Sequence, residues 1–157
     1  MDTAPPLLVD ATARVTTVIC IAILASIPLY VAIAWIVVGQ GAGKLGGGLP
    51  PVLTGALAAA GIAVLAIAQV VWGAMKRGAA AKPTPAERLA SYRSAAVVSF
   101  ALRESAAVIG LAITFLTGDV RWCLALSAAA LLAMLLGWPR RADVVRLAGD
   151  PAATPIG

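Results

Sequence analysis

Residues 95–117 read AAVVSFALRESAAVIGLAITFLT, an apolar run interrupted only by the adjacent charges Arg103 and Glu104. A transmembrane helix needs about 20 predominantly apolar residues, so this run is long enough to cross a bilayer. Ionisable residues at that depth are rare, and by default they indicate a functional site or a buried contact. The stretch therefore predicts a membrane-spanning helix whose charged pair marks where assembly or chemistry takes place.

The composition of the whole chain also indicates a membrane protein. Of its 157 residues, 61% are hydrophobic and only 12% are charged, whereas soluble domains carry about 25% charged residues. So few charges cannot cover a globule in water, and we expect an integral membrane protein that contacts the lipid bilayer. The net charge of +5 comes largely from basic residues that flank apolar runs. Because these are topology signals, we expect no nucleic-acid partner.

Three other apolar runs lie at 15–38, 52–75 and 120–138. The first two contain no charged residue, and the last is close to the lower length limit of about 17 residues for a spanning helix. The sequence therefore predicts an all-α fold, a polytopic integral membrane protein with four transmembrane helices. They would form a single domain, residues 1–157, with a cytoplasmic loop at 76–94.

The orientation of these helices follows from their basic flanks. Of the 12 Lys and Arg residues, nine lie in the N-terminal arm, the loop 76–94 and the C-terminal tail. Only Lys44 and Arg121 lie in the loops on the other side, and Arg103 lies within a span. Cytoplasmic segments are enriched in Lys and Arg. We therefore expect a multi-pass protein of the cell (inner) membrane with both termini in the cytoplasm.

Local signals predict where the helices begin and end. Residues 84–87 read TPAE, a capping box with proline at the first helical position, so the third helix should begin near Pro85. Gly118 suits the C-cap of that helix and Asp119 the N-cap of the next. Pro139 should end the fourth helix, because proline and the residue before it disfavour helical geometry.

Three segments should depart from regular helix. Pro28, in the middle of the first run, predicts a kink. The glycine-rich stretch 39–48 matches a GxGxxG pattern, but it lies between two spans and not between a strand and a helix. We interpret it as a flexible linker. The residues from about Asp143 should form a short frayed tail.

Small residues at four-residue spacing predict close helix packing. The pairs are Gly55 with Ala59, Ala56 with Ala60, and Ala106 with Gly110. Such spacing lets helix backbones approach closely inside a membrane, where lipid supplies no hydrophobic drive for association. The pattern leaves open whether the packing occurs within one chain or between copies.

The charged pair needs polar partners, because each charge at the centre of a span costs about 2.5–3.5 kcal/mol. Adjacent helical residues project about 100° apart, so the two side chains do not face each other. Arginine stays protonated, whereas Glu104 can either pair or take up a proton. We expect a polar layer that serves as an assembly contact or as an ion or proton site. Its expected members are Arg103, Glu104, Gln69, Ser99, Ser26 and Ser127.

Catalytic and metal-binding roles lack the residues that they need. The chain has no histidine, no plausible pair of nucleophile and base, and no second carboxylate within a span, so we expect no enzyme activity. Cys20 and Cys123 would lie near opposite membrane faces, so we expect neither a disulfide nor a zinc site. No metal or cofactor is implied.

Residues 52–119 resemble a hairpin of the rotary ATPase proteolipid, subunit c. An Ala/Gly-rich helix containing Gly55–Gly61 and a basic loop are followed by a helix with a carboxylate after Ala-Leu-x, at residues 101–104, and then Gly110. In that family the carboxylate binds the transported proton or sodium ion, and many copies form a ring. The resemblance implies that Glu104 is an ion-binding residue.

Two functions are therefore expected. The first is a small non-enzymatic integral membrane protein, an accessory or structural subunit that forms a homo-oligomer or joins a larger membrane complex. Arg103 and Glu104 would hold that contact. The alternative is a proteolipid-like proton or ion carrier that uses Glu104. A component of a small-molecule transporter is disfavoured, because the spans lack a substrate-sized set of polar residues.

Overall fold

The computed structural model describes residues 5–41 and 49–149. Within these residues the chain is helical and contains no strand, as the sequence predicts. Most of the predicted flexible linker, residues 42–48, lies outside the described part, as does the end of the chain from residue 150. The helices are α1 Pro6–Gly39, α2 Pro51–Ala80, α3 Pro85–Thr117, α4 Val120–Leu136 and α5 Arg141–Leu147.

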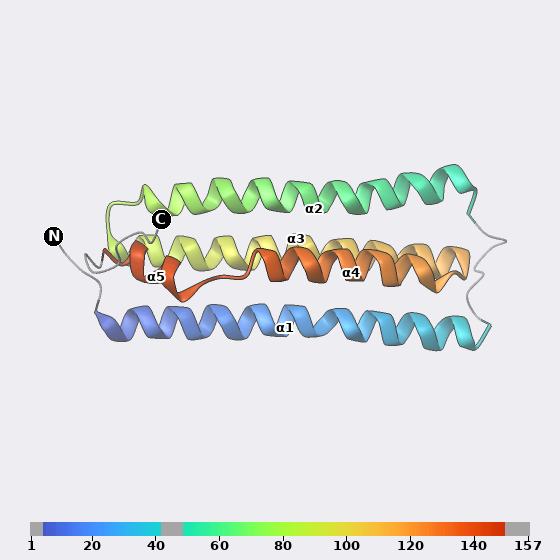
Figure 1. Ribbon diagram of the computed structural model, residues 1–157, viewed down its shortest axis with the longest axis horizontal. Helices are drawn as coiled ribbons and strands as arrows, with labels where there is room; N and C mark the ends of the chain where they lie inside the picture. The colour runs from blue at the N-terminus through green and yellow to red at the C-terminus, as the bar shows by residue number, and fades with distance from the viewer. Residues whose placement is uncertain (1–4, 42–48, 150–157) are drawn as a thin grey trace.

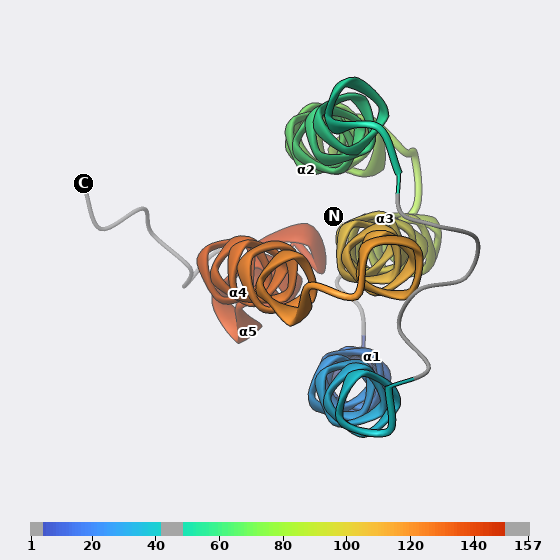
Figure 2. The same cartoon turned by 90° about the vertical axis from the view of Figure 1, so that its right-hand side faces the viewer.

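Helix α3 is the centre of the bundle. The four long helices lie side by side with alternating direction, and the short α5 lies at the same end as the start of α1 (Figure 1). Seen along the bundle, α1 and α2 flank α3 on opposite sides, and α4 covers a third side (Figure 2). Accordingly, α3 carries more buried residues than any other helix. Side chains of α3 therefore meet a different neighbour on each face.

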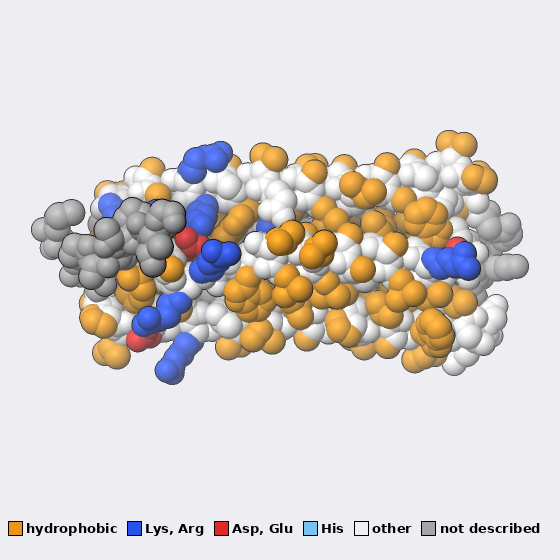
Figure 3. Space-filling model, viewed as in Figure 1, with side chains coloured by type: hydrophobic (Ala, Val, Ile, Leu, Met, Phe, Trp, Pro, Cys, Tyr) orange, Lys and Arg blue, Asp and Glu red, His pale blue; other side chains and the backbone are white. Residues whose placement is uncertain are grey.

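Three helices, α1, α2 and α3, are long and apolar enough to cross a membrane. Helices α4 and α5, bent by 46° at the break between them, make a fourth candidate span when taken together. Hydrophobic side chains cover the middle of the visible face, and Lys and Arg gather mostly towards the end that carries α5 (Figure 3). This distribution is that expected of a multi-pass membrane protein.

The helix ends follow the predicted signals at three places. Thr84 Oγ1 accepts a hydrogen bond from the Glu87 backbone N–H at 3.3 Å, and Pro85 is the first residue of α3. Gly118 ends α3 with a positive φ of 73°, a conformation that favours glycine. Asp119 caps α4 by accepting from the Arg121 N–H at 3.0 Å.

Helix α1 does not show the kink expected at Pro28. It is one continuous helix through this residue, without a sharp bend in Figure 1. The missing N–H removes a single hydrogen bond from a helix of 34 residues, and neighbouring residues can absorb the change. The predicted loop 76–94 is also mostly helical, because α2 continues to Ala80 and α3 already begins at Pro85.

The segment after α4 is a helix, so the frayed tail expected from about Asp143 is wrong here. Helix α5 is too short to be stable alone, but tertiary contacts hold it. Its Val144 is 2% exposed and packs in one cluster with Tyr92 of α3. Asp143 Oδ2 lies 2.8 Å from Lys76 Nζ of α2. Burial of one side chain and an ion pair therefore fix a segment whose sequence looks polar.

Candidate functional site

The adjacent residues Arg103 and Glu104 reach different neighbours of α3. Glu104 contacts α1, where Ser26 and Tyr30 can both donate to its Oε1. Arg103 contacts α2, where its Nη2 donates to Gln69 Oε1 at 3.1 Å. Within the described residues neither of the two side chains forms an ion pair. The charged residues therefore link α3 to the two helices that flank it in Figure 2.

One oxygen of the Glu104 carboxyl faces two hydroxyl groups. Oε1 lies 2.5 Å from Ser26 Oγ and 2.6 Å from Tyr30 Oη, which are four residues apart on one face of α1. Glu104 is half-buried. It lies about 14 Å along α3 from Ala95, where the apolar run begins. This carboxyl is thus near the middle of the run, at the seam between α1 and α3.

The hydrogen bonds around Glu104 are compatible with both of its protonation states. Ser26 Oγ is also 2.6 Å from the Ile23 carbonyl oxygen, but a hydroxyl has only one hydrogen to donate. When Glu104 is ionised, Ser26 and Tyr30 both donate to it. When Glu104 is neutral, it can donate to Ser26, which then donates to Ile23, while Tyr30 still donates to Glu104. Neither state leaves a hydroxyl without a partner.

Arg103 is fully buried, with 0% of its surface exposed. Its guanidinium carbon is 5.5 Å from the centre of the Phe100 ring, within range of a cation–π contact. Beyond the bond to Gln69, its Nε and Nη1 are enclosed and have no hydrogen-bond partner among the described residues. Each buried polar group left unsatisfied costs about 1–3 kcal/mol, and more when it is charged. Arg103 therefore links α3 to α2 while two of its nitrogen atoms stay unsatisfied.

The Arg103 guanidinium lies against the end of α4. A Cβ built on Gly137, the C-cap of α4, would collide with this guanidinium, so the glycine lets Arg103 approach the end of α4 in its observed position. The C-terminal end of a helix carries a partial negative charge, which favours a cation there. Pro139 disfavours helix at the residues before it, and non-helical backbone at membrane depth must be covered by protein. Arg103 supplies part of that cover.

The other two serines of the predicted layer do not bond to the charged residues. Ser99 lies one turn before Arg103 and is 0% exposed, but its Oγ has no hydrogen-bond partner in the described part of the chain. Ser127 is buried in α4, with its Oγ 3.8 Å from Cys123 Sγ. The polar residues thus form two separate contacts on different faces of α3, together with two serines in the core.

Tyr30 is the contact residue that the sequence analysis did not name. Its hydroxyl lies within the apolar run 15–38, one helical turn after Ser26. Two hydroxyl side chains at this spacing share a helix face. That spacing was a usable signal for a hydrogen-bonding site, although it does not show which helix carries the acceptor.

The small-residue pairs divide into an inner and an outer set. A Cβ on Gly110 would lie 3.0 Å from the Trp122 carbonyl oxygen and 3.2 Å from Cys123 Cα, so α3 and α4 meet closely at this glycine. Gly55 faces outward, because a Cβ there would meet nothing within 4 Å. The pair Ala106 and Gly110 therefore packs within the chain. The exposed set on α2 comprises Gly55, Ala56, Ala59 and Ala60.

No protein-family model, curated protein or solved structure matches this chain. Its function is therefore inferred from its own contacts and packing.

Proposed function

We propose that this chain is a non-enzymatic, multi-pass protein of the inner membrane that serves as an accessory or structural subunit. It would cross the bilayer four times, with residues 120–138 forming the last span, and would assemble with copies of itself or with a larger complex. Arg103 and Glu104 would fix α3 between α1 and α2, so that the bundle presents a rigid surface. The observation that carries this proposal is the outward small-residue face of α2.

That face, made of Gly55, Ala56, Ala59 and Ala60, is exposed in the single chain. Small residues at this spacing permit close backbone contact between helices in a membrane. Helix α2 packs mainly on α3 and has little contact with α4. Its opposite side is therefore available for a helix from another chain.

We expect Gly55→Val to weaken association while leaving the fold intact. Valine at this position has open space around it in the single chain, but it would separate two helices packed at this face. Overpacking costs about 1–3 kcal/mol, which corresponds to roughly 5- to 150-fold weaker association. The measurement is the apparent mass of the complex extracted from membranes, together with energy transfer between labelled copies in liposomes.

The matched control is Gly110→Val, whose side chain would meet the α4 backbone. This variant should lose thermal stability because it disturbs packing within one chain, and this loss should not depend on assembly. If Gly55→Val leaves both the complex mass and the energy transfer unchanged, the α2 face is not an interface and the proposal loses its main support.

The proposed orientation can be tested with single cysteines at Gln40 and Ala80. Both residues are exposed; Gln40 follows the last residue of α1, and Ala80 is the last residue of α2, at the opposite end of the bundle (Figure 1). The native Cys20 and Cys123 are buried and would be replaced by alanine. An impermeant maleimide should label intact cells at Gln40→Cys and not at Ala80→Cys. Labelling of both from the same side contradicts the four-span topology.

A second candidate function is a proteolipid-like proton or ion carrier that uses Glu104. The specific observation in its favour is the carboxyl at the middle of the apolar run, with a hydrogen-bond arrangement that suits either protonation state. Glu104 is only half-buried, so an ion could approach its carboxyl at the seam of α1 and α3. The resemblance of residues 52–119 to the rotary ATPase proteolipid also supports this candidate.

A further inference from the structure

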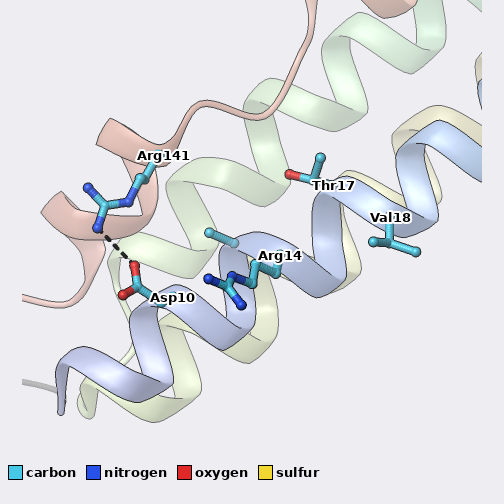
Figure 4. Close-up of a pocket in the computed structure, with 6 residues that line it drawn as sticks. Asp10, Arg14, Thr17, Val18 and Arg141 are labelled. Atoms are coloured by element: carbon cyan, nitrogen blue, oxygen red, sulfur yellow. Dashed lines mark hydrogen bonds and ion pairs between the residues drawn. The ribbon is translucent and has the colours of Figure 1, made fainter.

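A groove lies between α1 and α5 at the end of the bundle that the sequence places in the cytoplasm. It has a volume of about 630 Å³. It is lined by Asp10, Arg14, Thr17 and Val18 of α1 and by Arg141 of α5, and Figure 4 shows Arg141 reaching across to Asp10. The groove is separate from the contacts of Arg103 and Glu104, and neither proposed function uses it.

Two arginines and one aspartate set the charge of the groove. Arg141 Nη2 donates to Asp10 Oδ1 at 2.8 Å. This hydrogen bond, and the positive charge of Arg141, lower the pKa of Asp10 below its ordinary value, so Asp10 is ionised at neutral pH. Arg14 has no carboxylate partner among the described residues. The groove therefore has a net charge of +1, and both guanidinium groups keep unused N–H donors.

Thr17 adds an uncommitted hydroxyl between the charges and the apolar part of the groove. The neighbouring Thr16 donates to the Thr12 carbonyl oxygen at 2.8 Å, as hydroxyls in helices often do. Thr17 makes no such side-chain hydrogen bond within the described residues, and it is one of the residues that line the groove. Val18, one residue further into the span, is 65% exposed. Polar and apolar side chains thus follow one another along the groove.

The position of the groove suits a lipid. Arg14 immediately precedes the apolar run 15–38, so its guanidinium lies where the phosphate groups of a bilayer meet the hydrocarbon. Basic pockets between helices on the cytoplasmic side recognise anionic head groups. Arginine matches a phosphate by donating two parallel hydrogen bonds.

We propose that this groove binds the phosphate group of an anionic phospholipid. Arg14 and Arg141 donate to its oxygens, and Thr17 donates a further hydrogen bond. Val18 contacts the glycerol and the first acyl carbons below them. The inference rests on the proposal that the chain is a membrane protein, and it adds a lipid that would hold α5 against α1.

The test is native mass spectrometry of the full chain in detergent with phosphatidylglycerol or phosphatidylcholine added. The parent should retain phosphatidylglycerol more strongly than phosphatidylcholine. Arg14→Gln should retain about fivefold less, because one basic contact is lost. Arg93→Gln, which removes an exposed arginine of α3 just before its apolar run and outside the groove, should match the parent. Equal loss in the two variants, or no lipid preference in the parent, overturns the inference.

Two further variants separate lipid binding from folding. Asp10→Asn frees Arg141 and should increase retention of phosphatidylglycerol, whereas a decrease contradicts the proposed role of Arg141. Arg14→Gln breaks no ion pair in the described residues, so its melting temperature without added lipid should equal that of the parent. Release of the parent from membranes by alkaline carbonate would refute the membrane proposal itself, while altered lipid selectivity concerns the groove alone.

Discussion

Replacing Arg103 with methionine should make the bundle more stable. The guanidinium is fully buried and has one neutral hydrogen-bond partner, with Nε and Nη1 enclosed and unpaired in the described residues. Replacing a buried ion pair by apolar side chains of similar volume is often neutral or stabilising by about 1–4 kcal/mol, and here the partner left behind, Gln69, is exposed and not buried. The measurement is the midpoint of thermal or denaturant unfolding in detergent, followed by circular dichroism.

The comparison variant is Gln69→Leu, which removes the partner and keeps the charge. It should lower stability by about 1.5–3 kcal/mol, the contribution of a hydrogen bond to a charged group. If Arg103→Met is as destabilising as Gln69→Leu, the guanidinium has favourable interactions that its single hydrogen bond does not explain. Its packing on Phe100 and the end of α4 would then be the place to look.

If Arg103→Met is more stable than the parent, Arg103 is not needed for the fold and its role would be in function. Residues that lower stability are often found at functional sites. Arg103 lies beside Gly137, where α4 ends and the chain continues to α5. Loss of the complex from a more stable variant would place the assembly role at this break, and an unchanged complex would leave that role to the α2 face.

The sequence predicted the helices well because hydropathy and capping are local properties. The apolar runs, the Thr84 cap and the left-handed Gly118 each depend on a few neighbouring residues. Helix α5 was missed because its stability comes from long-range contacts, the burial of Val144 and the ion pair of Asp143. Such contacts have no signature in the composition of the segment itself.

The candidate site was predicted in part for the same reason. Helical geometry alone shows that Arg103 and Glu104 diverge. It does not show which helix each side chain meets, because this depends on the order of helices around α3. Close packing at Gly110 places α4 on one face of α3, and α1 and α2 flank two others. Tyr30 becomes a partner of Glu104 only in that arrangement.

Carbodiimide should label Glu104 in the purified protein, and labelling should rise as the pH falls. The reagent attacks a protonated carboxyl in an apolar setting. The hydrogen bonds from Tyr30, and through Ser26 to Ile23, leave the neutral acid fully satisfied. Intact mass and peptide mapping across pH are the measurements, and Glu104→Gln should abolish the labelling at this site.

Tyr30→Phe provides the sharper version of this experiment. Tyr30 donates to Oε1 in either state, but the bond is stronger to an ionised carboxylate. Removing the hydroxyl therefore takes away one of the two donors to the carboxylate, and labelling of this variant should exceed that of the parent. Tyr30 is only half-buried, so the loss of one hydroxyl should leave the fold intact, which circular dichroism would verify.

The same variants decide between the two proposed functions. A carrier requires that Glu104 take up and release its ion, so the parent should support a flux in liposomes that Glu104→Gln abolishes. Labelling without any flux would mean that the carboxyl is protonated as a fixed link between α1 and α3. Absence of labelling at every pH would mean that Glu104 stays ionised against its two hydroxyl donors. Either result would rule out the carrier function. Glu104 would then be the residue that holds α1 in place for assembly.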